Sequence, residues 1–98
     1  MNSLLRSVMA LVLGAGVVMP VSAGVDELYS QSCATCHADG VLGSPRTGDQ
    51  AAWAPRLKQG MPTLVQRVRS GYKNMPARGL CDQCTDADYA ALITLMSK

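Results

Sequence analysis

Hydrophobic positions near the end of the chain follow the spacing of an amphipathic helix. Four of them repeat at i, i+3, i+4 and i+7: Tyr89, Leu92, Ile93 and Met96. Thr85 and Asp88 precede this series with the spacing of a capping box, which marks the start of a helix. The pattern therefore predicts a C-terminal helix that follows Thr85 and buries one apolar face.

A second helix is predicted from about Val25 into the segment around Cys33. Val25, Leu28 and Tyr29 fall on one helical face, and two acidic residues occupy the first turn, where the helix dipole favours negative charge. The segment 39–48 holds three glycines and a proline, which indicates a loop.

Two shorter helices are predicted between this loop and the C-terminal helix. Asp49 is suited to cap the first of them, which Pro55 kinks or restarts. Pro62 suits the first turn of the next helix, which ends at Gly71, and residues 72–84 form a second loop. No stretch alternates with a period of two over the length of a strand, so the predicted fold class is all-α.

The first 23 residues have the pattern of a secretory signal peptide. A short segment with one positive charge, Arg6, precedes an apolar run over residues 7–19, and small residues lead up to Ala23. The run is shorter than the roughly 20 residues that span a bilayer. An N-terminal amphipathic or buried helix is the alternative, but the run is apolar all round. We expect cleavage after Ala23, which leaves one domain at 24–98 in the periplasm with no membrane span.

The composition of this domain limits what can fill its core. The chain has 98 residues, with nine basic and seven acidic ones, and loses only Arg6 among its charges on cleavage. This near-neutral balance gives no support for nucleic-acid binding. The chain has no Phe, one Trp and three Tyr. A domain this small and this poor in aromatic residues needs a disulfide, a metal or a cofactor for stability.

The run Cys33-Ala34-Thr35-Cys36-His37 has the spacing of a c-type haem attachment site. Each thiol can form a thioether with one haem vinyl group, and the adjacent imidazole can then ligate the iron. Two alternatives are a redox disulfide between Cys33 and Cys36, and a four-thiolate zinc site with Cys81 and Cys84. The zinc alternative leaves His37 unexplained, and the redox motif belongs to a βαβ pattern that is absent here.

These residues resemble class I cytochromes c, and most closely the cytochrome c5 group. The resemblance covers nearly all of 24–98, and its motifs lie at 33–37, 43–45, 53–56, 74–76 and 81–84. It implies a small fold in which the N- and C-terminal helices cross around one covalent haem c. It also implies that the Pro45 carbonyl holds the ring of His37, and that Cys81 and Cys84 form a structural disulfide.

The sixth iron ligand has two candidates, because Met61 and Met75 both precede a proline. Met61 lies at the start of a predicted helix, whereas Met75 lies in a loop that can fold over the far face of the haem. The resemblance also places the ligand in this loop, so we predict His37 and Met75 as the metal ligands. Trp53 and Arg56 are further candidates to contact a haem propionate, through the indole N–H and the guanidinium charge, with core packing as the alternative for Trp53.

The predicted function is one-electron transfer by a periplasmic carrier that docks transiently on redox proteins. Two filled axial positions leave no place for a substrate, so enzyme activity is not expected. Lys58, Lys73 and Arg78 are candidates for a weak docking rim on a monomer. Two other possibilities remain open at this point: a haem-bearing subunit of a larger oxidoreductase, and an interaction module stabilised by zinc or disulfides.

Overall fold

The computed structural model describes residues 24–98, and the predicted signal peptide at 1–23 lies outside them. The described elements are α2 (Val25–Gln31), α3 (Ala34–His37), η1 (Val41–Gly43), α4 (Gln50–Leu57), α5 (Met61–Ser70), η2 (Ala77–Leu80) and α6 (Asp86–Met96). Over the same residues no strand is formed, and Tyr72 and Met75 make only an isolated bridge. The all-α prediction is confirmed.

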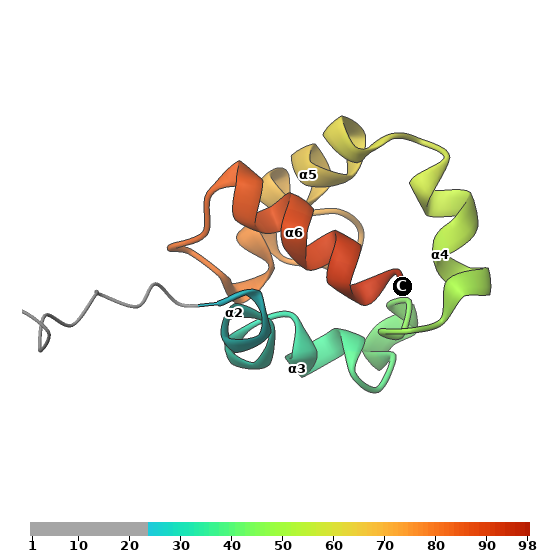
Figure 1. The fold of residues 1–98 in the computed structure, drawn as a ribbon, viewed down its shortest axis with the longest axis horizontal. Coiled ribbons are helices and arrows are strands. Elements are labelled where there is room, and N and C mark those ends of the chain that lie inside the picture. The colour runs from blue at the N-terminus through green and yellow to red at the C-terminus, as the bar shows by residue number, and fades with distance from the viewer. Residues whose placement is uncertain (1–23) are drawn as a thin grey trace, which may run out of the picture.

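Helix α6 lies at the centre of the fold and packs against both α2 and α5 (Figure 1). The core is made of ten buried residues: Leu28, Trp53, Leu64, Val65, Cys81, Cys84, Tyr89, Leu92, Ile93 and Met96. Helix α4 contacts α5. The chain from α3 to α4 follows the lower and then the right-hand edge of the molecule in Figure 1. The N- and C-terminal helices therefore meet, as the resemblance implied.

The start of α6 is the capping box predicted from Thr85 and Asp88. The Thr85 hydroxyl accepts a hydrogen bond from the Asp88 backbone N–H at 3.2 Å, and the Asp88 carboxylate accepts one from the Thr85 N–H at 2.9 Å. Two otherwise unpaired backbone donors are satisfied in this way. All four apolar residues of the predicted stripe are buried, which confirms the assignment of this helix.

The predicted N-terminal helix is interrupted where it reaches the cysteine motif. Helix α2 ends at Gln31, and Ser32 leaves the helical region with φ −139° and ψ −78°. The buried Ser32 hydroxyl donates to the Leu28 carbonyl, four residues back. Such side-chain bonds compete with the helix backbone and are frequent where helices bend or end. The chain then turns and resumes as α3, which brings Cys33 to the corner.

The two central helices differ from the prediction at one proline. Helix α4 begins after Asp49, whose carboxylate accepts from the Ala52 N–H at 3.1 Å, but it continues through Pro55 to Leu57. Pro55 and Ala51 are exposed, so water can satisfy the carbonyl that loses its helical partner. Helix α5 starts as predicted, with Pro62 in its first turn, and Gly71 follows its last residue with φ 87°.

Candidate haem-binding site

One cavity of about 470 Å³ opens between α3, α4, α5 and α6 and the loops that join them. Its volume lies in the range of roughly 300–1,000 Å³ that is usual for cofactor pockets. All seven residues that were predicted to bind a cofactor line it: Cys33, Cys36, His37, Pro45, Trp53, Arg56 and Met75. The structure therefore brings the whole predicted cofactor-binding set to one cavity.

His37 is the buried end of α3 and has a defined orientation. Its Nδ1 lies 2.7 Å from the carbonyl oxygen of Pro45, and its side chain is 7% exposed. A proline carbonyl can only accept, so Nδ1 carries the proton and Nε2 is left free to ligate a metal. The hydrogen bond between His37 and Pro45 that the resemblance implied is present. The ring of Trp53 lies 5.7 Å from the imidazole, centroid to centroid.

Cys33 and Cys36 are free thiols, and both line the cavity. They lie three residues apart on one helical turn, where the His37 N–H donates to the Cys33 carbonyl at 2.9 Å. Side chains at this spacing share a helix face. Burial raises the pKa of the Cys33 thiol, and the Ser32 hydroxyl lowers it by a smaller amount. This turn places two thiols and one imidazole within reach of one ligand.

Met75 is presented by a tight turn over residues 72–75. Tyr72 and Met75 exchange two backbone hydrogen bonds, with N···O distances of 3.0 and 2.8 Å, and Lys73 inside the turn has φ 52°. The Met75 methyl group contacts the backbone of Gly79 so closely that an added Cβ there would come within 2.8 Å of it. Met61 does not line the cavity and packs against the core.

Trp53 and Arg56 line the cavity, but their polar groups have partners within the protein. The indole N–H of Trp53 donates to the Arg46 carbonyl at 2.9 Å, and the ring is buried. An Arg56 guanidinium nitrogen donates to the Ala52 carbonyl at 2.6 Å. The contacts of Trp53 match the core-packing alternative. Arg56 keeps further N–H groups that can face a ligand.

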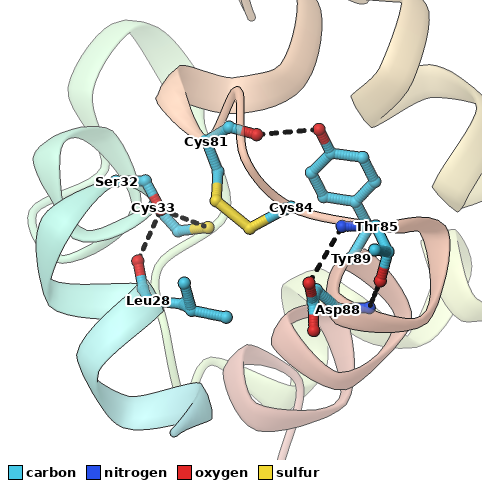
Figure 2. Close-up of a disulfide and its surroundings, with 8 residues drawn as sticks. All are labelled: Leu28, Ser32, Cys33, Cys81, Cys84, Thr85, Asp88 and Tyr89. Carbon is cyan, nitrogen blue, oxygen red and sulfur yellow. Dashed lines mark hydrogen bonds between the residues drawn. A yellow bond between two sulfur atoms is a disulfide. The ribbon is translucent and has the colours of Figure 1, made fainter. Parts of the chain in front are cut away.

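Cys81 and Cys84 form a disulfide just before α6 (Figure 2). Both are buried, and the Tyr89 hydroxyl donates to the Cys81 carbonyl at 2.9 Å. The disulfide removes two of the four thiolates that a zinc site would need, so the zinc alternative is wrong. Within residues 24–98, no group of three or more His, Cys, Asp or Glu side chains is placed to hold a metal ion.

Three features of the site were not predicted from the sequence. Gly79 is in contact with Met75. The sequence feature that could have indicated this contact is the short separation of four residues between them. Tyr29, which lies on the apolar face of the predicted N-terminal helix, also hydrogen-bonds to the Thr47 hydroxyl at 2.7 Å. Leu42 and Leu80 line the cavity mouth with exposed side chains. Their places in the predicted loops 39–48 and 72–84, each beside a glycine, were the available signal.

A small all-α domain whose cavity is lined by a Cys-x-x-Cys-His turn and by a methionine from a distant loop defines a mono-haem cytochrome c. The family described as "Cytochrome C oxidase, cbb3-type, subunit III" matches residues 22–96. Cytochrome c-555 of Chlorobaculum tepidum is 49% identical over 72 residues, which cover 69% of this chain and 67% of that protein. Cytochrome c5 of Azotobacter vinelandii is 38% identical over 74 residues, or 74% and 89% of the two chains.

Solved structures show the same likeness. A mono-haem ferrocytochrome c from Shewanella putrefaciens is 40% identical, with a TM-score of 0.71 over 81% of this chain and 98% of that one. A chain in an electron transfer complex of nitrite reductase with cytochrome c is 36% identical, with a TM-score of 0.69 over 80% and 95%. The chain belongs to the cytochrome c family, near the c5 group, and is a small electron carrier with one covalently bound haem c.

Proposed function

We propose that residues 24–98 act in the periplasm as a one-electron carrier whose haem iron is ligated by His37 and Met75. In this proposal residues 1–23 are a signal peptide that is removed on export. The observation that supports it most directly is that both free thiols, His37 and Met75 line the same cavity.

The chain's own residues prepare this cavity for a covalent cofactor. The haem supplies one-electron chemistry when it is bound. The proton on His37 Nδ1 is held by Pro45, which orients Nε2 toward the cavity. The turn at residues 72–75 supplies a thioether, a soft ligand that favours the reduced metal. With His37 and Met75 both holding the iron, the site would transfer electrons and would leave no position for a substrate.

The mouth of the cavity has the character of a transient docking surface. Its exposed large hydrophobic side chains are Val41, Leu42, Tyr72 and Leu80. Arg56, Arg67 and Lys73 also line the cavity, and none of the described residues that line it is acidic. Lys58 and Arg78, the other two residues of the predicted rim, are exposed but do not line it. An acidic, partly apolar redox protein fits this surface.

The related chain in the nitrite reductase complex supports docking on a larger redox enzyme. Encounters of redox proteins bury less than about 1,200 Å² and separate quickly. Among the described helices, none is long and apolar enough to cross a membrane. We propose that the carrier docks as a monomer and forms no permanent complex.

A haem-bearing subunit of a larger oxidoreductase is the second candidate function. The description of the matching family as an oxidase subunit favours it. Native extracts separated by size and stained for covalent haem distinguish the two functions. A free carrier elutes at the size of this domain, whereas a subunit co-elutes with a larger assembly.

The attachment of haem is tested by mass spectrometry of the exported protein together with acid–acetone extraction. We expect a chain that begins near Gly24 and carries one haem that the solvent does not remove. Cys33→Ala or Cys36→Ala should reduce holoprotein formation, because one thioether is lost. Complete extraction of the colour from the wild-type protein would contradict the proposed attachment.

A further inference from the structure

Four consecutive residues beside His37, Pro45 to Gly48, together form hydrogen bonds with four helices. We call this segment the proximal strap. Its partners are His37 of α3, Trp53 of α4, Tyr29 of α2 and Met96 of α6. The Pro45 carbonyl accepts from His37, the Arg46 carbonyl from Trp53 at 2.9 Å, and the Gly48 N–H donates to Met96 at 2.7 Å.

Thr47 makes two of the contacts in the proximal strap. Its backbone N–H donates to the His37 carbonyl at 2.8 Å, and its hydroxyl pairs with the Tyr29 hydroxyl at 2.7 Å. Tyr29 and Thr47 are half-buried, so this hydroxyl pair is partly shielded from water. Thr47 therefore connects the N-terminal helix directly to the residue that bears the imidazole.

We propose that Tyr29 and Thr47 are positioning residues that act through the proximal strap on the hydrogen bond between Pro45 and His37. The inference rests on the proposed role of His37 as an iron ligand. The strap has no regular secondary structure of its own, so its place is set by these side chains and backbone groups. Loss of the Tyr29–Thr47 pair frees the strap on the side of α2.

The expected direction of the effect follows from the chemistry of the imidazole. A hydrogen bond from Nδ1–H to a carbonyl raises the basicity of the ligating nitrogen. A more basic ligand stabilises the oxidised metal relative to the reduced one. A looser strap weakens this hydrogen bond, and the reduction potential should therefore rise.

The first test compares two substitutions that remove one hydroxyl each. Tyr29→Phe breaks the bond to Thr47, whereas Tyr89→Phe breaks a buried bond to the Cys81 carbonyl, which belongs to another loop. In the holoprotein, Tyr29→Phe should raise the potential and speed exchange of the His37 Nδ1 proton by roughly three- to tenfold, the factor that one hydrogen bond represents. Tyr89→Phe should leave the potential unchanged.

The second test uses Thr47, for which two conservative variants exist. Thr47→Val removes the hydroxyl and should reproduce the effect of Tyr29→Phe, whereas Thr47→Ser keeps the hydroxyl and should restore the wild-type potential. The double variant Tyr29→Phe/Thr47→Val should shift the potential no further than either single variant, because the two hydroxyls form one interaction.

The outcomes separate this inference from the proposed function. If NMR of the wild-type holoprotein shows no haem-shifted His37 signals, the role of His37 as a ligand is wrong. A second outcome is that the signals are present while Tyr29→Phe and Tyr89→Phe alter the exchange rate of the His37 Nδ1 proton equally and leave the reduction potential unchanged. In that case the strap contributes to stability alone and the inference is overturned. A potential that falls in Tyr29→Phe also overturns it.

Discussion

At the scale of single residues, two leucines at the cavity mouth adopt backbone angles that favour glycine. Leu42 has φ 53° and is 74% exposed, and Leu80 has φ 66° and is 54% exposed. The left-handed region costs a non-glycine residue roughly 1–2 kcal/mol. Strain of this kind persists where the surrounding structure imposes it, and it is concentrated at functional sites. Two large apolar side chains are thereby held in solvent at the proposed docking surface.

Leu42→Gly should separate stability from docking. Glycine relieves the backbone strain but adds freedom to the unfolded chain, so the free energy of unfolding should change by less than about 1 kcal/mol. The second-order rate of electron transfer to an acidic redox partner should fall severalfold. Thermal melts and stopped-flow kinetics measure the two effects. Leu57→Gly, at an exposed leucine away from the cavity, should leave that rate unchanged; an equal loss there would contradict the assignment.

Met75→Ala tests the proposed sixth ligand. Loss of the thioether should abolish the charge-transfer band of methionine-ligated ferric haem. It should also lower the reduction potential by an amount on the order of 0.1 V, within the range that axial ligands span. Optical spectra and a redox titration provide the measurements.

Met61→Ala is the control, since Met61 packs against the core and does not line the cavity. Its spectrum and potential should stay close to those of the wild type. Met96 is buried and also lines the cavity, so Met96→Leu provides a second comparison. A silent Met75 variant beside a sensitive Met61 or Met96 variant would refute the assignment.

At the scale of elements, the disulfide connects the loop that bears Met75 with the start of α6. Cys81 and Cys84 belong to the same buried cluster as Leu28, and Cys33 packs against this cluster (Figure 2). The corner that attaches the haem and the loop that presents Met75 therefore rest on one small piece of core.

Replacing Cys81 and Cys84 together by Ala should destabilise the domain modestly. The closed loop is short, since the cysteines are three residues apart, so we expect a loss of at most about 2 kcal/mol. For a domain of this size this lowers the melting temperature by up to roughly 12 °C. Electron-transfer rates at ambient temperature should stay within a few-fold of the wild-type rates. Two trappable thiols in freshly isolated wild-type protein would show that the bond does not form in the cell.

At the scale of the whole molecule, charge is distributed unevenly around a nearly neutral domain. Three basic side chains line the cavity, namely Arg56, Arg67 and Lys73, and the Arg67 guanidinium lies 4.2 Å from the centre of the exposed Tyr72 ring. Asp86, by contrast, lies at the start of α6 and pairs with Arg69. An acidic partner is therefore attracted toward the face that holds the cavity.

Electron transfer to an acidic partner should slow as ionic strength rises. The screening length is about 10 Å at 0.1 M salt, so exposed charges lose most of their attraction beyond that distance. Lys73→Gln should flatten the dependence of the rate on salt, whereas Lys98→Gln should leave it unchanged, because Lys98 does not line the cavity. A slope that both substitutions alter equally would indicate that net charge alone steers the encounter.

The sequence by itself determined the parts of this protein whose signals are local. The Cys-x-x-Cys-His turn, the capping box at Thr85 and the apolar stripe of α6 depend on spacings of three or four residues, which helix geometry sets directly. The all-α class and the choice of Met75 over Met61 as candidate ligand also came from such patterns and from family resemblance.

Only the tertiary structure decided the contacts between residues distant in the chain. It gave the Trp53 N–H a backbone partner at Arg46 and joined Tyr29 to Thr47 across 18 positions. It also carried α4 through Pro55. These contacts form because polar groups that are buried away from water must find partners within the protein. The spacing of residues along the chain does not specify those partners.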